Sequence, residues 1–254
     1  MGDAFGLVRG KRIPASNWQN ICENGSALCI SLLTLDMTCD IWDVPVANFG
    51  NGFPDMHMFP ITTPVAVPWE PGVAVVFGRA EGKDRKPLST DPRNVLIRQL
   101  ERAQNMGITV NVGTELEFYL LDPNTGLPRD EGIQVYGLSR AARMEHIVGP
   151  IRQQVNQCGI PIEQSNPEFA PGQVEVNIRY AEALLAADCV VLFKSLVRQL
   201  GIMHDYLTTF MPKPFFEESG SGFHTHYSFW KDGKNIFASD GRINCTAKAF
   251  IAGL

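Results

Sequence analysis

The strand that decides the fold reads Gly113-Thr114-Glu115-Leu116-Glu117-Phe118. It lies within residues 108–121, which we interpret as a strand that ends at a turn rich in Asp, Pro, Asn and Gly. Alternate residues of a strand point to the same face, so Glu115 and Glu117 share one face while Leu116 and Phe118 share the other. The stretch therefore predicts a sheet with one carboxylate-bearing face and one apolar face.

Two later stretches, residues 172–179 and 222–230, repeat this alternation. Their polar faces carry, in chain order, Gln173, Glu175, Asn177, His224, His226 and Ser228. One such strand is ordinary, because antiparallel sheets commonly have one face in water. Three in succession, enriched in Glu and His, indicate a shared functional face.

Crowded carboxylates repel one another unless a positive charge lies between them, and a divalent metal ion is the simplest candidate. The predicted metal ligands are Glu115, Glu117, Glu168, Glu175 and His224. Four carboxylates and one imidazole suit Mg²⁺ or Mn²⁺ better than a structural zinc, which favours Cys and His. Mg²⁺ fills the rest of its shell with water and phosphate oxygens, so the pattern predicts phosphate chemistry.

Composition excludes several classes of function. The chain has 254 residues, of which 44% are hydrophobic and 19% charged, as in a globular protein. A net charge of -5 without a Lys/Arg cluster argues against nucleic-acid binding. No apolar run reaches the ~18 residues of a membrane span, and no signal peptide is visible. Six cysteines without a C-x-x-C pair fit reduced thiols, so we expect a cytoplasmic protein.

The chain is predicted to have two domains, residues 1–85 and 86–254, because residues 78–87 are polar and rich in turn formers. The first contains short apolar runs separated by Gly and Pro, which predicts a small β-rich unit. The second alternates strands with helices. The first helix is expected from Pro92 to Gly107, with Asp91 as its cap. Two further helices are expected at residues 141–158, with a kink or shift at Pro150, and at residues 182–207. A glycine-rich loop, Ser219-Gly220-Ser221-Gly222, precedes the His-bearing strand and allows close approach of a ligand.

Four motifs resemble the glutamine synthetase family of ATP-dependent glutamate–amine ligases. They are Gly113-Thr114-Glu115-Leu116-Glu117-Phe118, Pro167-Glu168 with Gly172-Gln173-Val174-Glu175, Thr209-Phe210-Met211-Pro212-Lys213-Pro214, and Gly220-Ser221-Gly222-Phe223-His224-Thr225-His226-Tyr227-Ser228. The resemblance covers essentially the whole chain. It implies an α+β fold, with an N-terminal β-grasp-like domain followed by the first part of a catalytic domain built on a curved antiparallel sheet with flanking helices.

The resemblance also implies a role for each candidate residue. Glu117, Glu168 and Glu175 resemble the ligands of one Mg²⁺ or Mn²⁺ ion. Glu115 and His224 resemble two of the three ligands of a second ion, which engages the phosphates of ATP. Three positions correspond to nucleotide contacts, namely Glu163, His226 and Ser228.

The remaining roles concern the substrates. Ser219 and Gly220 correspond to contacts with glutamate. Asp55 and Glu168 are the candidate catalytic residues, and Asp55 resembles the acid that reaches the ammonium pocket from a neighbouring subunit. Tyr136 is aligned with the lining of that pocket.

The implied reaction joins ammonia or an amine to the γ-carboxylate of glutamate through γ-glutamyl phosphate, in a homo-oligomeric ring with active sites between subunits. Ser219 stands where ammonia-using members usually carry Asn, so a γ-glutamyl-polyamine or alkylamine ligase is an alternative. The family normally continues for roughly as many residues again after the position of Leu254. We therefore expect a C-terminally truncated chain with an incomplete second metal site, and a catalytically silent structural or regulatory member is a further alternative.

Overall fold

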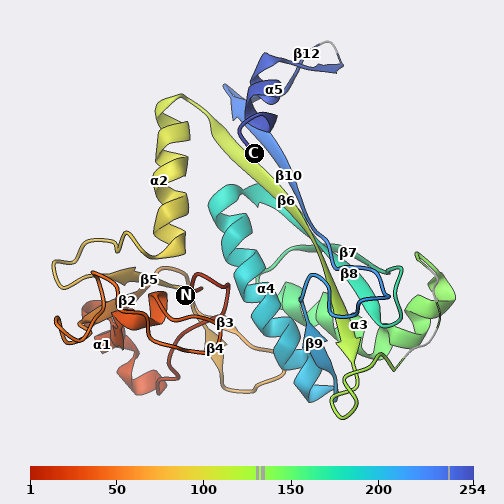
Figure 1. Ribbon diagram of the computed structural model, residues 1–254, viewed down its shortest axis with the longest axis horizontal. Coiled ribbons are helices and arrows are strands. Elements are labelled where there is room, and N and C mark those ends of the chain that lie inside the picture. The colour runs from red at the N-terminus through yellow and green to blue at the C-terminus, as the bar shows by residue number, and fades with distance from the viewer. Residues whose placement is uncertain (130–131, 133–134, 240) are drawn as a thin grey trace. The chain divides into compact units, whose positions relative to one another are not determined.

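The computed structural model describes residues 1–129, 132, 135–239 and 241–254. These residues form two compact units, Met1–Gln99 and Leu100–Leu254. Both units mix helices with antiparallel strands, so the predicted α+β class is confirmed (Figure 1). Helix α2, Pro92–Asn105, runs across the division between the units. None of the described helices combines the length and apolarity needed to cross a membrane.

The N-terminal unit is built on a three-stranded antiparallel sheet of order β1-β2-β5. Its elements are η1 Ala15–Asn17, α1 Trp18–Asn24, β1 Ser26–Cys29, η2 Ile30–Leu33, β2 Asp55–Pro60, β3 Val65–Ala66, β4 Ala74–Val75 and β5 Gly78–Glu81. Strands β3 and β4 pair in a separate hairpin. Leu28, Met56 and Ala80 are buried in a small core of this unit, and burial of such apolar side chains is the main favourable term in folding.

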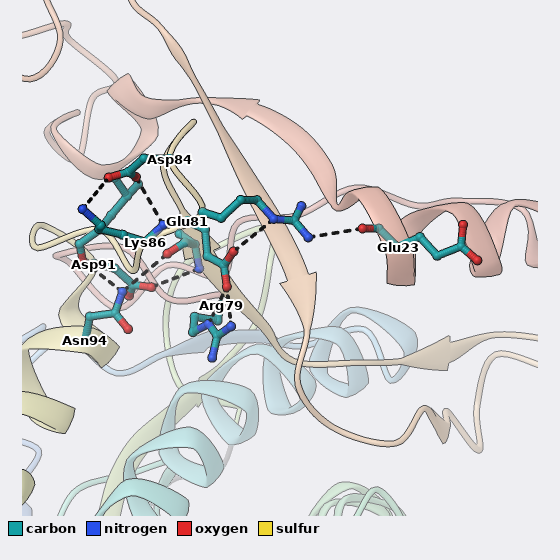
Figure 2. A network of polar contacts seen from close by, with 10 residues as sticks. Glu23, Arg79, Glu81, Asp84, Lys86, Asp91 and Asn94 are labelled. Atoms are coloured by element: carbon teal, nitrogen blue, oxygen red, sulfur yellow. Dashed lines mark hydrogen bonds and ion pairs between the residues drawn. The ribbon is translucent and has the colours of Figure 1, made fainter.

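A network of polar contacts joins β5 to the start of α2 (Figure 2). The buried carboxylate of Asp91 accepts hydrogen bonds from the backbone N–H groups of Arg93, at 2.9 Å, and Ala80, at 3.3 Å. Asn94, also buried, donates to the carbonyl of Leu88 at 2.9 Å. Asp91 thus caps α2 as predicted and also fixes it to β5.

The C-terminal unit is built on a six-stranded antiparallel sheet of order β11-β10-β6-β8-β7, with β9 paired to the end of β6. The strands are β6 Thr109–Leu121, β7 Ile162–Pro167, β8 Gln173–Glu182, β9 Leu207–Thr209, β10 Phe223–Lys231 and β11 Lys234–Asn235. The long strands β6 and β10 lie side by side in the view of Figure 1 and pair from Thr109 to Leu116 of β6. The sheet curls, as expected for the fold class.

Two long helices, α3 Leu138–Gln157 and α4 Ala183–Met203, pack against this sheet. Phe118 of β6 is fully buried and contacts Phe193 of α4, with ring centroids 6.3 Å apart in an edge-on arrangement. Val174 and Val176 of β8 are buried in the same layer. The helices therefore cover the apolar face of the strands and leave the carboxylate-bearing face open.

Two predicted helix boundaries differ from the structure. Helix α3 begins at Leu138 instead of residue 141 and contains Pro150, and Ile147, Ile151 and Val155 on both sides of the proline are fully buried. Helix α4 ends at Met203 instead of residue 207, since the left-handed Asp205 turns the chain and β9 pairs with β6.

The last described segments form a small aromatic layer. They are β12 Ala238–Ser239, β13 Arg242–Ile243 and α5 Cys245–Ile251. The ring of Phe229 on β10 lies 4.5 Å from that of Phe237 and 5.0 Å from that of Phe250. These ring contacts hold α5 against β10. They lie outside the polar face that carries the candidate site.

Candidate metal and phosphate site

Strand register brings the three predicted polar faces together. His224 of β10 is paired with Glu115 of β6, and Glu117 of β6 is paired with Glu175 of β8. Since β6 lies between β10 and β8, the carboxylates of the central strand are flanked by the imidazole on one side and by Glu175 on the other. The prediction that these strands share one polar face is confirmed.

One group of side chains on this face has the spacing of a metal site. Glu115, Glu175 and His224 each offer one ligand atom, and these atoms lie within 4.8 Å of one another. The Nδ1 atom of His224 is 3.1 Å from Oε2 of Glu115. Two carboxylates and one imidazole at this spacing suit a divalent cation of the Mg²⁺ or Mn²⁺ type.

Glu117 and Glu168 line the same cavity, but their carboxylates are held by amides. Gln173 donates to Oε2 of Glu117 at 2.9 Å, and Asn166 donates to Oε1 of Glu168 at 2.9 Å. The predicted trio of Glu117, Glu168 and Glu175 does not form a second group of that spacing among the described residues. Mutual repulsion of the three carboxylates favours such separation, and amide donors stabilise it.

The electrostatics of the site show that it is short of positive charge. Burial, with the charge of Glu117 added, raises the pKa of Glu168. Burial, with the charges of Glu115 and Glu168 added, raises the pKa of Glu175. The hydrogen bond to Glu115 raises the pKa of His224. Each shift reflects excess negative charge in a partly desolvated place, which is the condition that a bound cation relieves.

The cluster opens into a cavity of about 450 Å³. It is lined by Glu115, Glu117, Val135, Tyr136, Gln164, Glu168, Phe169, Glu175, Asn177, Ser219, Gly220, Gly222 and His224. The cavity is large enough for a small ligand in addition to a metal ion. It thus contains the five predicted metal ligands, both predicted glutamate-binding residues and Tyr136.

The glycine-rich loop closes one wall of this cavity. The hydroxyl of Tyr119 donates to the carbonyl of Ser219, and burial raises the pKa of Tyr119 to about 12, so it stays a donor. The backbone N–H of Glu117 donates to the carbonyl of Gly222 at 3.1 Å. A Cβ atom on Gly222 would lie 2.7 Å from Oε1 of Glu117 and 2.8 Å from Nε2 of His224. A side chain at this position would therefore displace the ends of the two neighbouring ligands.

The other predicted residues lie outside the cavity lining. Nε2 of His226 is 3.2 Å from Oε1 of Glu115, so His226 adjoins the cluster. Ser228 accepts a hydrogen bond from Trp230 at 2.9 Å, further along β10. Glu163 is exposed on the edge strand β7. Asp55 is exposed at the start of β2 in the N-terminal unit. Their predicted roles, nucleotide contact for the first three and catalytic carboxylate for Asp55, stay predictions.

Several functional neighbours had no assigned role at the level of sequence. Arg140 on α3 is buried and donates to the carbonyl of Ala170 at 2.7 Å, which shapes the turn after Glu168. Asn166 and Gln173 hold carboxylates, as described above. Gln173 was visible as a member of the polar face of its strand, whereas the contact of Arg140 depends on a partner 30 residues away.

Two aromatic side chains that line the cavity are exposed. Tyr136 is 65% exposed and Phe169 is 57% exposed, although both line the cavity. The charges of Glu175 and Glu168 raise the pKa of Tyr136, which places its phenol within their field. Aromatic faces next to carboxylates attract organic cations.

Comparison with known proteins agrees with this arrangement. Residues 89–254 match the family model described as "Glutamine synthetase, catalytic domain". The chain is 39% identical, over 99% of its length, to a glutamine synthetase from Pyrococcus horikoshii, of which it covers 54%. It is 29% identical, over 99% of its length, to a glutamate–isopropylamine ligase from a Pseudomonas species, of which it covers 59%.

A solved structure described as a GmaS/ADP complex superposes with a TM-score of 0.86 at 31% sequence identity, covering 100% of this chain and 58% of the other. The chain thus spans about half the length of the proteins that it matches. Its sequence, its fold and the composition of its polar face all agree, and the chain belongs to the glutamine synthetase family.

Proposed function

We propose that this chain is the metal-bearing part of an ATP-dependent ligase that joins ammonia or an amine to the γ-carboxylate of glutamate. The observation that carries the proposal is the group of Glu115, Glu175 and His224, whose ligand atoms lie within 4.8 Å of one another. The donor set fits Mg²⁺ or Mn²⁺, and the raised pKa values of Glu168 and Glu175 mark a place that favours a cation.

In this proposal the five ligands belong to two metal sites. Glu117, Glu168 and Glu175 hold one ion, while Glu115 and His224 contribute to a second, next to the nucleotide contacts His226, Ser228 and Glu163. When bound, the ions supply positive charge against the phosphate oxygens of ATP. Glu175 is the natural link between the two sets, because it is paired with Glu117 across the sheet and lies in the cluster with Glu115.

The remaining residues position the organic substrates. Ser219 and Gly220 hold glutamate so that an oxygen of its γ-carboxylate faces the γ-phosphorus of ATP. That oxygen forms the new P–O bond, the bond to ADP breaks, and γ-glutamyl phosphate results. The amine nitrogen then attacks the acyl carbon, phosphate leaves, and a carboxylate such as Asp55 takes the proton. Asp55 acts in the site of a neighbouring subunit of a homo-oligomeric cytoplasmic ring.

A γ-glutamyl-alkylamine ligase is the favoured variant of this function, because Tyr136 and Phe169 present exposed rings at the cavity. A small alkylammonium ion fits such a wall, since the ring faces attract the charge and the alkyl group loses contact with water. Ammonium, which has no alkyl group, gains only the attraction of its charge to the ring faces.

The test is a coupled ADP-release assay on the protein encoded by the whole reading frame. ATP, Mn²⁺ and glutamate are combined in turn with ammonia, methylamine, isopropylamine or putrescine. The proposal predicts ADP release that requires both glutamate and an amine, and the variant predicts a higher kcat/KM for an alkylamine than for ammonia. Substituting Phe169→Ala should lower the alkylamine value more than the ammonia value. ADP release that does not depend on glutamate contradicts the proposal.

A further inference from the structure

Gln173, the first residue of β8, is fully buried beside the site and uses every hydrogen-bonding group of its amide. Its Nε2 donates to Oε2 of Glu117 at 2.9 Å and to the carbonyl of Gly220 at 3.0 Å. Its Oε1 accepts from the backbone N–H of Ala170 at 3.0 Å. The orientation of the amide is fixed by its partners, because a flipped amide would set two N–H groups against the Ala170 donor and an oxygen against two acceptors.

The two acceptors joined by Nε2 belong to different parts of the site. Glu117 is a proposed metal ligand on β6, and Gly220 belongs to the loop proposed to hold glutamate. Both expose oxygen atoms toward the same place, so they repel each other unless a donor lies between them. The NH₂ group of Gln173 is that donor, and one side chain satisfies both oxygens.

Other contacts hold the glycine-rich loop on either side of its hydrogen bond with Gln173. Its ends are held by Tyr119, which donates to the Ser219 carbonyl, and by the Gly222 carbonyl, which accepts from the Glu117 backbone at 3.1 Å. Between these ends, the carbonyl of Gly220 accepts its hydrogen bond from Gln173. A change in the orientation of the Glu117 carboxylate is therefore transmitted to Gly220 through one amide.

We infer that Gln173 is a positioning residue that couples the carboxylate of Glu117 to the glycine-rich loop, so that metal binding and loop order depend on each other. This inference rests on the proposed function and identifies what joins its metal site to its glutamate site. A buried amide that touches no substrate acts only through the groups it orients.

The first test compares Mn²⁺ binding by the wild type with that of Gln173→Met, which keeps the side-chain volume and removes the amide. Binding is followed by the loss of the free Mn²⁺ signal in electron paramagnetic resonance. We expect Gln173→Met to weaken binding by about 10–100-fold, the effect of losing a group that orients a metal ligand. The matched control is Gln154→Met on α3, whose buried Oε1 has no hydrogen-bond partner among the described residues, and it should bind as the wild type does.

The second test measures backbone hydrogen exchange, first in the wild type and then in Gln173→Met. The coupling predicts that Mn²⁺ slows exchange of the amides of residues 219–222, and that this slowing is absent in Gln173→Met if that variant folds. Unchanged exchange of the loop on addition of Mn²⁺ overturns the inference, even where the variant is unfolded.

The outcomes separate the inference from the proposed function. If the wild type does not bind Mn²⁺, the proposed function fails and the inference falls with it. If the wild type binds Mn²⁺ and Gln173→Met binds it equally well, the inference alone is overturned. Weaker binding by Gln173→Met with normal binding by Gln154→Met, together with the slowed loop exchange, supports it.

Discussion

Glu175 is placed at the centre of the polar face, where burial and the three neighbouring carboxylates of Glu115, Glu168 and Glu117 raise its pKa. Because its pKa is higher in the folded than in the unfolded chain, the folded chain binds more protons in the interval between the two values. The free energy of unfolding of the metal-free chain therefore falls as the pH rises above the ordinary glutamate range.

This linkage predicts the behaviour of Glu175→Gln without metal. The variant should melt at the same temperature as the wild type near pH 4, and a few degrees higher at pH 8, since ~1 kcal/mol corresponds to about 2–4 °C for a chain of this size. Thermal melts in EDTA at several pH values check this. Saturating Mn²⁺ at pH 8 should reverse the order, and a wild type that is the more stable form at pH 8 in EDTA would refute the account.

Gly222 gives a second test at the residue scale. A Cβ atom there would lie 2.7 Å from Oε1 of Glu117 and 2.8 Å from Nε2 of His224, so Gly222→Ala must displace both ligands. We expect Mn²⁺ affinity to fall by at least about tenfold, as for other changes that misplace a ligand. Isothermal titration measures it. Gly113→Ala on β6 is the control, because its Cβ would meet Tyr180 at an ordinary 3.5 Å.

Helix α2 shows what one cap contributes at the scale of an element. Asp91→Ala removes acceptors from the N–H groups of Arg93 and Ala80 and should lower the free energy of unfolding by about 1–2 kcal/mol. Urea denaturation of the two proteins provides the measurement. Asp91→Asn keeps one oxygen for the N–H of Arg93 and loses the acceptor for Ala80, so it should lose less than Asp91→Ala. An unchanged free energy of unfolding in Asp91→Ala would contradict the role of the cap.

Alternation along the strands was enough to predict three long strands of the C-terminal unit and their shared face. Residues 108–121, 172–179 and 222–230 were expected as strands, and β6, β8 and β10 occupy them within three residues at each end. A period of two is a local property, so the sequence displays it. The end of α4 at Met203 was missed because β9 gains a partner in β6, which is a contact distant in sequence.

The grouping of ligands could not be derived from the strands alone. Alternation predicted that Glu115, Glu117 and Glu175 face the same way, but the closeness of Glu175 to Glu115 and His224 depends on register and side-chain orientation. The roles of Gln173 and Arg140 depend on hydrogen bonds to residues 30 or more positions away. The sequence pattern predicts which residues share a face of a strand, whereas the hydrogen-bond partners of those residues are set by tertiary packing.

At the scale of the whole molecule, the proposed ring predicts that subunits share active sites. Asp55 would serve one site and Glu175 the next, so Asp55→Ala and Glu175→Ala should each lack ligase activity in the protein encoded by the whole reading frame. Dissociating and reassembling the two variants together should restore activity that neither has alone. Continued inactivity of the mixture, with mixed oligomers present by mass spectrometry, would contradict the proposal that Asp55 acts in the site of a neighbouring subunit.

The central claim is that the polar face of the sheet holds divalent metal ions, and metal-dependent thermal stability tests it most directly. Mn²⁺ that binds only the folded chain must raise the melting temperature of the wild type as its concentration exceeds Kd. We predict that Glu117→Ala and Glu175→Ala each abolish this rise, and that Glu101→Ala, which removes an exposed carboxylate on α2, leaves it intact. An undiminished rise with Mn²⁺ in both site variants would contradict the claim.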